Sequence, residues 1–144
     1  MIAMGCDHGG YALMQQVKDF LDEQNISYVD YGCYSEDSVD YPDIAQKVCS
    51  EVVNGACDKG LLFCGTGIGM SIAANKINGI RAAVCSDWFS AKYTRLHNDA
   101  NVLCLGGRVV GAGLACELVD VFLKTDYEGG RHQNRLNKIA ALEK

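Results

Sequence analysis

The 144-residue sequence has a single proline and a single tryptophan, and no apolar run approaches the roughly 18 to 20 residues that a membrane-spanning helix requires. Its first residues, Met1 to Asp7, reach an acidic side chain without a basic segment followed by a long apolar one. They therefore lack the pattern of a secretory signal peptide. We expect a cytoplasmic protein with no membrane segment.

An excess of positive charge is also missing. The 13 lysines and arginines are outnumbered by 18 acidic residues, which gives a formal net charge of −5. This balance disfavours nucleic acid as a partner. A small anionic ligand would need a local basic cluster, and one stretch near the C-terminus stands out, with Arg131, Arg135 and Lys138.

Eight cysteines are present, but no Cys-x-x-Cys pair is found among them. They are spread evenly along the chain, and several lie inside apolar runs. A chain of this length can also form a stable hydrophobic core without disulfide bonds. We expect most of them to be buried, reduced and structural; they are Cys6, Cys33, Cys49, Cys57, Cys64, Cys85, Cys104 and Cys116.

Strand and helix patterns alternate along the whole sequence. Short apolar runs predict strands at 2–5, 27–30, 59–64, 80–85 and 101–105. Helical spacing of apolar residues predicts helices at 11–24, 42–52, 70–76, 88–96, 111–124 and 133–142. Continuous apolar strands between helices are typical of a parallel sheet that is covered on both faces. We predict one α/β domain over residues 1–144, a Rossmann-like three-layer sandwich with about five parallel strands.

In such sheets ligands bind beyond the carboxyl ends of the strands. The first strand leads to Asp7 and His8, the third leads to a glycine-rich segment at 64–69, and the fifth leads to Arg108. The end of the fourth helix adds His97 and Asn98 to this group of polar residues. The sequence therefore predicts that the functional site gathers at this edge.

The glycine-rich segment Gly65–Gly69 lies between a strand and a helix, where backbone N–H groups favour an anion. It does not match the Walker A loop, and a tight strand–helix turn is an equally good interpretation. Cys64 immediately precedes this loop and the N-terminus of the next helix, a setting typical of reactive cysteines, so it could act as a nucleophile or a base. The phosphatase pattern is absent because Met70 replaces its arginine, but a cysteine hydrolase with a histidine partner remains open.

Several segments together resemble the type B ribose-5-phosphate isomerases and the related galactose-6-phosphate isomerase subunits. The similarity runs through essentially the whole chain in order. Its most specific parts are Cys-Gly-Thr-Gly-Ile-Gly and His-Asn-Asp-x-Asn. The matching segments are 5–10, 40–43, 64–76, 79–82, 97–103 and 129–135.

The resemblance implies an isomerase that interconverts ribose 5-phosphate and ribulose 5-phosphate through an enediolate. Asp7 and His97 would open the furanose ring, and Cys64 would move the proton between C2 and C1. Thr66 would hold or shuttle the hydroxyl proton. The backbone amides of the loop would stabilise the enediolate; the loop residues expected to bind substrate are Gly65, Gly67, Ile68 and Gly69.

The same resemblance assigns binding of the phosphate to His8, Arg108, Arg131 and Arg135. Arginine suits this role because its planar guanidinium can donate two parallel hydrogen bonds to phosphate oxygens. From the residues alone, Arg108 could instead cap a strand end, and Arg131 and Arg135 could form a solvated helix face. Sugar-hydroxyl contacts would come from Tyr41 and Asn98.

No metal and no organic cofactor are expected. The resemblance implies a homodimer, with a homotetramer as the alternative, in which the C-terminal helix reaches a partner subunit and both subunits build each site. His97 or Arg108 could belong to the partner's site. Rival interpretations are an allose-6-phosphate or galactose-6-phosphate isomerase and a non-catalytic phosphosugar-binding domain.

Overall fold

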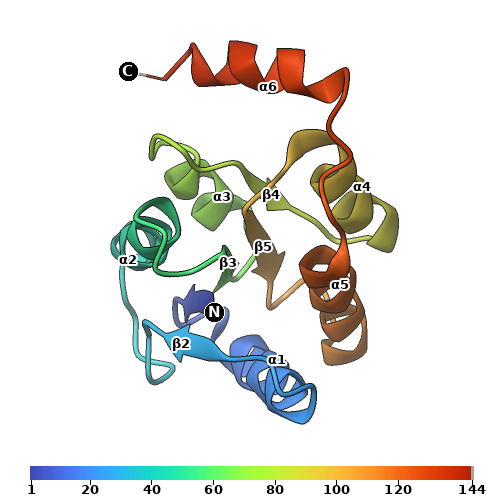
Figure 1. The fold of residues 1–144 in the computed structure, drawn as a ribbon. Helices are drawn as coiled ribbons and strands as arrows, with labels where there is room; N and C mark the ends of the chain where they lie inside the picture. Colours follow the sequence, from blue (N-terminus) through green and yellow to red (C-terminus); the bar gives the residue numbers. More distant parts are fainter. Residues whose placement is uncertain (144) are drawn as a thin grey trace.

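The computed structural model describes residues 1–143, which form an α/β domain (Figure 1). Its strands are β1 (Ile2–Cys6), β2 (Tyr28–Asp30), β3 (Lys59–Cys64), β4 (Ala82–Val84) and β5 (Val102–Gly106). Its helices are α1 (Tyr11–Glu23), α2 (Tyr41–Val53), α3 (Ile68–Ala74), α4 (Trp88–Asn98), α5 (Ala112–Lys124) and α6 (His132–Ala140). The predicted alternation of strands and helices is confirmed.

The strands form one parallel sheet in the order β2-β1-β3-β5-β4. The most buried strands, β1, β3 and β5, lie at its centre. Cys6 pairs with Phe63, and Cys64 pairs with Gly106, so the carboxyl ends of the three central strands lie side by side. Chain order is reversed at the far edge because β4 forms the edge and β5 lies inside it.

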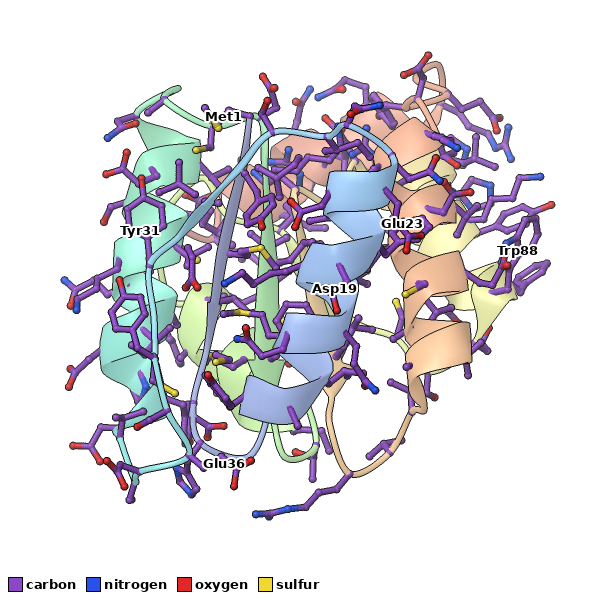
Figure 2. The ribbon with its side chains drawn as sticks, turned by 90° about the horizontal axis from the view of Figure 1, so that it is seen from below. Met1, Asp19, Glu23, Tyr31, Glu36 and Trp88 are labelled. Carbon is purple, nitrogen blue, oxygen red and sulfur yellow. The ribbon has the colours of Figure 1, made fainter. Side chains whose placement is uncertain are left out.

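Side chains alternate across the sheet and fill one core on each face. Along β3, Leu61 and Phe63 pack on the side of α1 and α5, while Leu62 and Cys64 pack on the side of α2 and α3. Figure 2 shows the side chains of α1 filling the space against the sheet, with Asp19 and Glu23 on its outer surface. The predicted three-layer sandwich is thus confirmed.

Local sequence explains most element boundaries. Pro42 occupies the first turn of α2, where its missing N–H costs no helical hydrogen bond. The carboxylate of Asp87 caps α4 by accepting from the backbone N–H of Ser90 at 2.7 Å. β4 is shorter than predicted because Ile80 and Arg81 precede the ladder, where the Arg81 N–H donates to the Asn101 side chain.

The C-terminal helix α6 stands outside the three layers. Figure 1 shows it across one end of the molecule, next to α4 and apart from the sheet. The buried residues of α6 are His132 and Leu136. None of the helices within residues 1–143 combines the length and the apolar character needed to cross a bilayer.

Candidate active site

The loops that follow β1, β3 and β5 are tied together at the carboxyl edge of the sheet. The Asp7 N–H donates to the carbonyl of Phe63 at 3.0 Å, and the Gly107 N–H donates to the carbonyl of Cys64 at 2.8 Å. The Arg108 N–H donates to the carbonyl of Gly65 at 2.9 Å. These bonds extend the sheet ladder beyond the strands, so the three loops have fixed positions relative to one another.

Close backbone contact between two of these loops requires glycine. A Cβ atom on Gly9 would lie 2.9 Å from the backbone nitrogen of Gly65, which is closer than real Cβ atoms come to other atoms. The loop that carries Asp7 therefore lies directly against the loop that follows Cys64. The sequence prediction that these two segments meet is confirmed.

Cys64, the last residue of β3, is buried and only 4% exposed. Its Sγ accepts a hydrogen bond from the backbone N–H of Gly67 at 3.1 Å. Gly67 has a φ of +81°, a left-handed conformation that turns its N–H back toward the strand end. In the loop that follows, Thr66 and Ile68 are exposed, and the Ile68 N–H donates to Thr66 Oγ1 at 3.2 Å. The sulfur thus has a polar contact at an edge that solvent reaches.

The cysteines of the core have a different environment. Burial raises the pKa of Cys85 to about 11 and that of Cys49 to about 12. Burial also raises the pKa of Cys104 and that of Cys6, which additionally lies next to Cys33. These thiols stay protonated at neutral pH, as expected for structural cysteines.

Asp7 and His8 are anchored by the backbone around them. Oδ1 of Asp7 accepts from the N–H groups of Gly9 and Gly10 at 2.8 and 3.1 Å, and Asp7 is 6% exposed. Nδ1 of His8 accepts from the Val39 N–H at 3.4 Å, so a neutral His8 carries its proton on Nε2. Both side chains are therefore oriented before any ligand arrives.

Two further predicted residues border the same loop. The guanidinium of Arg108 lies over Gly65, with Nη1 3.0 Å from the position of a Cβ on that glycine. The ring of Tyr41 lies against Gly69, with its Cε1 and Cζ 2.8 Å from the corresponding position. A side chain at either glycine would displace these groups. The chain's own Arg108 therefore belongs to the group around Cys64.

His97 and Asn98 do not lie at this edge, so that part of the sequence prediction is wrong for a single chain. The helix α4 starts beyond the carboxyl end of β4 and runs back to the amino edge, where it ends at Asn98. The chain from Asn101 to Gly106 then returns along β5, a distance of about 16 Å at roughly 3.3 Å per residue. His97 and Cys64 are thus at opposite ends of the sheet.

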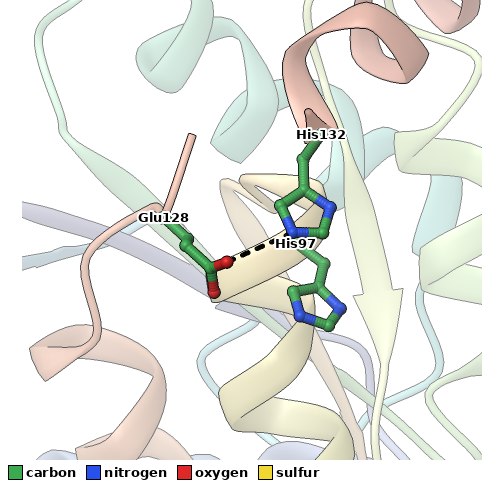
Figure 3. A group of neighbouring side chains, drawn as sticks. All are labelled: His97, Glu128 and His132. Atoms are coloured by element: carbon green, nitrogen blue, oxygen red, sulfur yellow. Dashed lines mark ion pairs between the residues drawn. The ribbon is translucent and has the colours of Figure 1, made fainter. Parts of the chain in front are cut away.

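His97 belongs to a second group of polar side chains, which Figure 3 shows together with Glu128 and His132. The rings of His97 and His132 stack with centroids 4.3 Å apart and an angle of 18°. Nε2 of His132 lies 3.5 Å from Oε1 of Glu128, and Arg131 Nη1 lies 3.8 Å from the same oxygen. The exposed Arg135 follows on α6. Of the four predicted phosphate residues, Arg131 and Arg135 are here and the other two lie near Cys64.

Sequence reasoning gave no role to Glu128 or His132. Their spacing of four residues, just before and at the start of a helix, was the available signal. These two residues and His97 each place one potential metal-ligand atom within 4.8 Å of the others. A metal bound to an imidazole lies close to the ring plane, and two nearly parallel stacked rings share no such point. A common metal would require one ring to turn out of the stack.

Comparisons with known proteins identify similar chains and a similar fold. A family model described as Ribose/Galactose Isomerase matches residues 2–139. The chain is 50% identical over 142 residues to ribose-5-phosphate isomerase B of Escherichia coli, covering 99% of this chain and 95% of that protein. It is 40% identical over 144 residues to the D-erythrulose-4-phosphate isomerase of Pectobacterium atrosepticum, covering 99% and 94%. The structure of Clostridium thermocellum ribose-5-phosphate isomerase B superimposes with a TM-score of 0.96 at 50% identity, covering 98% of this chain and 95% of the other.

Proposed function

This chain belongs to the ribose/galactose isomerase family, and we propose that it interconverts ribose 5-phosphate and ribulose 5-phosphate with Cys64 as the base. The relatives named ribose-5-phosphate isomerase B, which match almost the whole chain, support the substrate. The hydrogen bond from the Gly67 N–H to Cys64 Sγ is the observation that supports the base.

The peptide N–H of Gly67 holds the Cys64 sulfur in a fixed position at the end of β3. The Cys64 thiolate removes the proton from C2 of the open-chain aldose, and the electrons move onto O1 to give an enediolate. The same sulfur returns the proton to C1, while Thr66 passes the hydroxyl proton from O2 to O1. No net oxidation of the enzyme occurs.

The enediolate needs hydrogen-bond donors near its oxygens. Within Gly65–Gly69 the Gly67 amide is directed at sulfur and the Ile68 amide at Thr66 Oγ1. We assign the amides of Gly65, Thr66 and Gly69 to the enediolate. Loss of one such donor typically costs on the order of 3 kcal/mol of transition-state stabilisation.

We propose that the second group completes the site of a partner subunit in a homodimer. Residues that the reaction needs lie at two separate places in a single subunit. The base, Asp7, His8 and Arg108 lie at the carboxyl edge of the sheet, and His97 with the α6 arginines lies beyond the amino edge. Because α6 stands outside the three layers, its exposed arginines are free to contact a second copy. His97 then opens the furanose ring together with the partner's Asp7, and Asn98 and Tyr41 contact sugar hydroxyls.

The test is isomerisation by the purified protein of ribose 5-phosphate, allose 6-phosphate and galactose 6-phosphate in D2O. We expect the highest kcat/KM for ribose 5-phosphate, with deuterium incorporated from solvent, and no loss of activity after exhaustive chelation. A higher kcat/KM for a six-carbon sugar phosphate would show that ribose 5-phosphate is not the preferred substrate. Binding without exchange would identify a phosphosugar-binding domain, and a covalent adduct on Cys64 detected by mass spectrometry would identify a hydrolase.

A further inference from the structure

The imidazole of His97 is held by rings on two sides. The ring of Tyr93 makes a T-shaped contact with it, with centroids 5.1 Å apart at 78°, and the face of His132 stacks on it at 4.3 Å and 18°. Tyr93 comes from the preceding turn of α4, whereas His132 comes from α6. The face contact therefore depends on where the C-terminal helix lies.

His132 is itself placed by Glu128. It is 7% exposed, and its Nε2 is buried with no hydrogen-bond partner among residues 1–143. A carboxylate oxygen, Oε1 of Glu128, lies 3.5 Å from this nitrogen. Glu128 is in turn fixed to α4, because its N–H donates to the carbonyl of Leu96 at 3.1 Å. Glu128, which lies against His132, is thus hydrogen-bonded to Leu96, the residue before His97.

Ring contacts on two sides restrict the orientation of the His97 imidazole. A half-buried histidine at the end of a helix has a broad χ2 distribution when nothing constrains its ring. Ring opening requires the imidazole nitrogen within hydrogen-bond distance of the sugar oxygen, and displacements of about 1 Å can cost 100-fold in rate.

We propose that His132, held by Glu128, is a positioning residue that fixes the ring of His97 for opening of the furanose. This inference rests on the proposed function, in which His97 transfers the proton. His132 acts through His97 and carries no proton to or from the sugar in this assignment.

The first test observes the ring without any reaction. The chain has three histidines, so the imidazole signals of His97 can be assigned by NMR in the intact protein with a His97→Asn reference. We expect His132→Leu to move the His97 ring-proton shifts away from their stacked values, and His132→Phe to retain them in large part. Lys138→Ala, on the exposed side of α6, should leave them unchanged. Unaltered His97 signals in His132→Leu would overturn the proposal whatever the substrate proves to be.

The second test measures coupling in a double-mutant cycle. We expect His132→Leu to lower kcat on ribose 5-phosphate roughly 10- to 100-fold with little change in KM. In the His97→Asn background the same substitution should have no further effect, because the two residues act as one unit. Glu128→Gln, which removes only a charge, should cause a smaller loss that also disappears in that background. Additive losses would contradict the positioning role.

The two tests distinguish failure of the proposed function from failure of the positioning role. If wild-type protein does not isomerise ribose 5-phosphate, the proposed function is wrong, and the NMR result still decides whether His132 holds the ring. If isomerisation is observed and His132→Leu leaves kcat unchanged, the positioning role alone is refuted.

Discussion

The backbone N–H of Gly67 donates a hydrogen bond to Sγ of Cys64 across 3.1 Å. The φ of +81° at Gly67 produces this contact, because it turns the amide back onto the strand end. The sulfur assigned as the base is thereby held by a donor of its own loop. The relationship leads directly to the first two predictions.

Replacing Cys64 by alanine should abolish isomerisation and preserve ligand binding. Loss of a general base typically lowers kcat by roughly 10²- to 10⁴-fold. The arginines assigned to the phosphate are untouched, so calorimetry should still detect ribose 5-phosphate. Cys116→Ala on α5 is the control, because this thiol lies in a helix and outside the loop that follows β3. Activity of Cys64→Ala close to that of wild type would refute the assigned base.

Gly67→Ala should impair both stability and catalysis. Its Cβ would lie 2.9 Å from the carbonyl carbon of Leu105, and its φ is strained for alanine, so we expect about 1 to 3 kcal/mol of destabilisation. The displaced amide should also lower kcat. By contrast, Gly113→Ala in α5 meets no atom within 4 Å and should stabilise by about 0.4 to 1 kcal/mol. Urea unfolding measures both changes, and equal midpoints for the two variants would contradict the argument.

His97→Asn should separate ring opening from proton transfer. Ribose 5-phosphate is mainly a closed furanose, whereas ribulose 5-phosphate has its fifth oxygen phosphorylated and stays open. We expect the variant to lose most turnover of ribose 5-phosphate, roughly 10²-fold or more. It should retain exchange of the C1 protons of ribulose 5-phosphate with D2O, followed by NMR. Parallel loss of both activities would show that His97 acts on the carbon chemistry as well.

A mixture of two inactive variants tests whether sites are shared between subunits. Cys64→Ala supplies an intact His97, and His97→Asn supplies an intact Cys64. After unfolding and refolding together, mixed dimers would contain one complete site, which restores about a quarter of wild-type activity in an equal mixture. If both residues act within one chain, the mixture should remain as inactive as its components.

The N-cap of α4 should make a pH-dependent contribution to stability. The Ser90 N–H and hydroxyl donate to Asp87, which lowers the pKa of this carboxyl below its usual 3.8. A lowered folded pKa means that the ionised cap stabilises the protein above the unfolded value and loses this effect as the pH falls through the folded one. Wild type should therefore exceed Asp87→Asn in urea midpoint near pH 6, and the difference should shrink below about pH 4. A constant difference would contradict the assignment.

Much of the fold could be predicted because the relevant signals are local. The apolar run at 59–64 corresponds to β3 residue for residue, and Pro42 lies in the first turn of its helix as expected. The start of α3 was predicted two residues late, at Met70 and not at Ile68. Glycine next to that boundary obscured it, because a left-handed Gly67 allows the helix to begin at once.

The candidate site was predictable only where the residues follow strands. Parallel strands end at one edge, so sequence order alone brings Asp7, Cys64 and Arg108 together. The same reasoning misplaced His97, because a crossover helix returns its end to the other edge of the sheet. The four-residue spacing of Glu128 and His132 could not reveal the stacking of His132 on His97, because this contact joins α6 to α4.

The sequence by itself determined the layered α/β architecture and the chemistry available at its strand ends, because apolar periodicity and glycine placement act over a few residues. Only the tertiary structure decided which polar side chains meet. These side-chain contacts depend on the reversed order of β4 and β5, on the direction of α4 and on the position of α6 outside the sandwich. Long-range packing determines all three features.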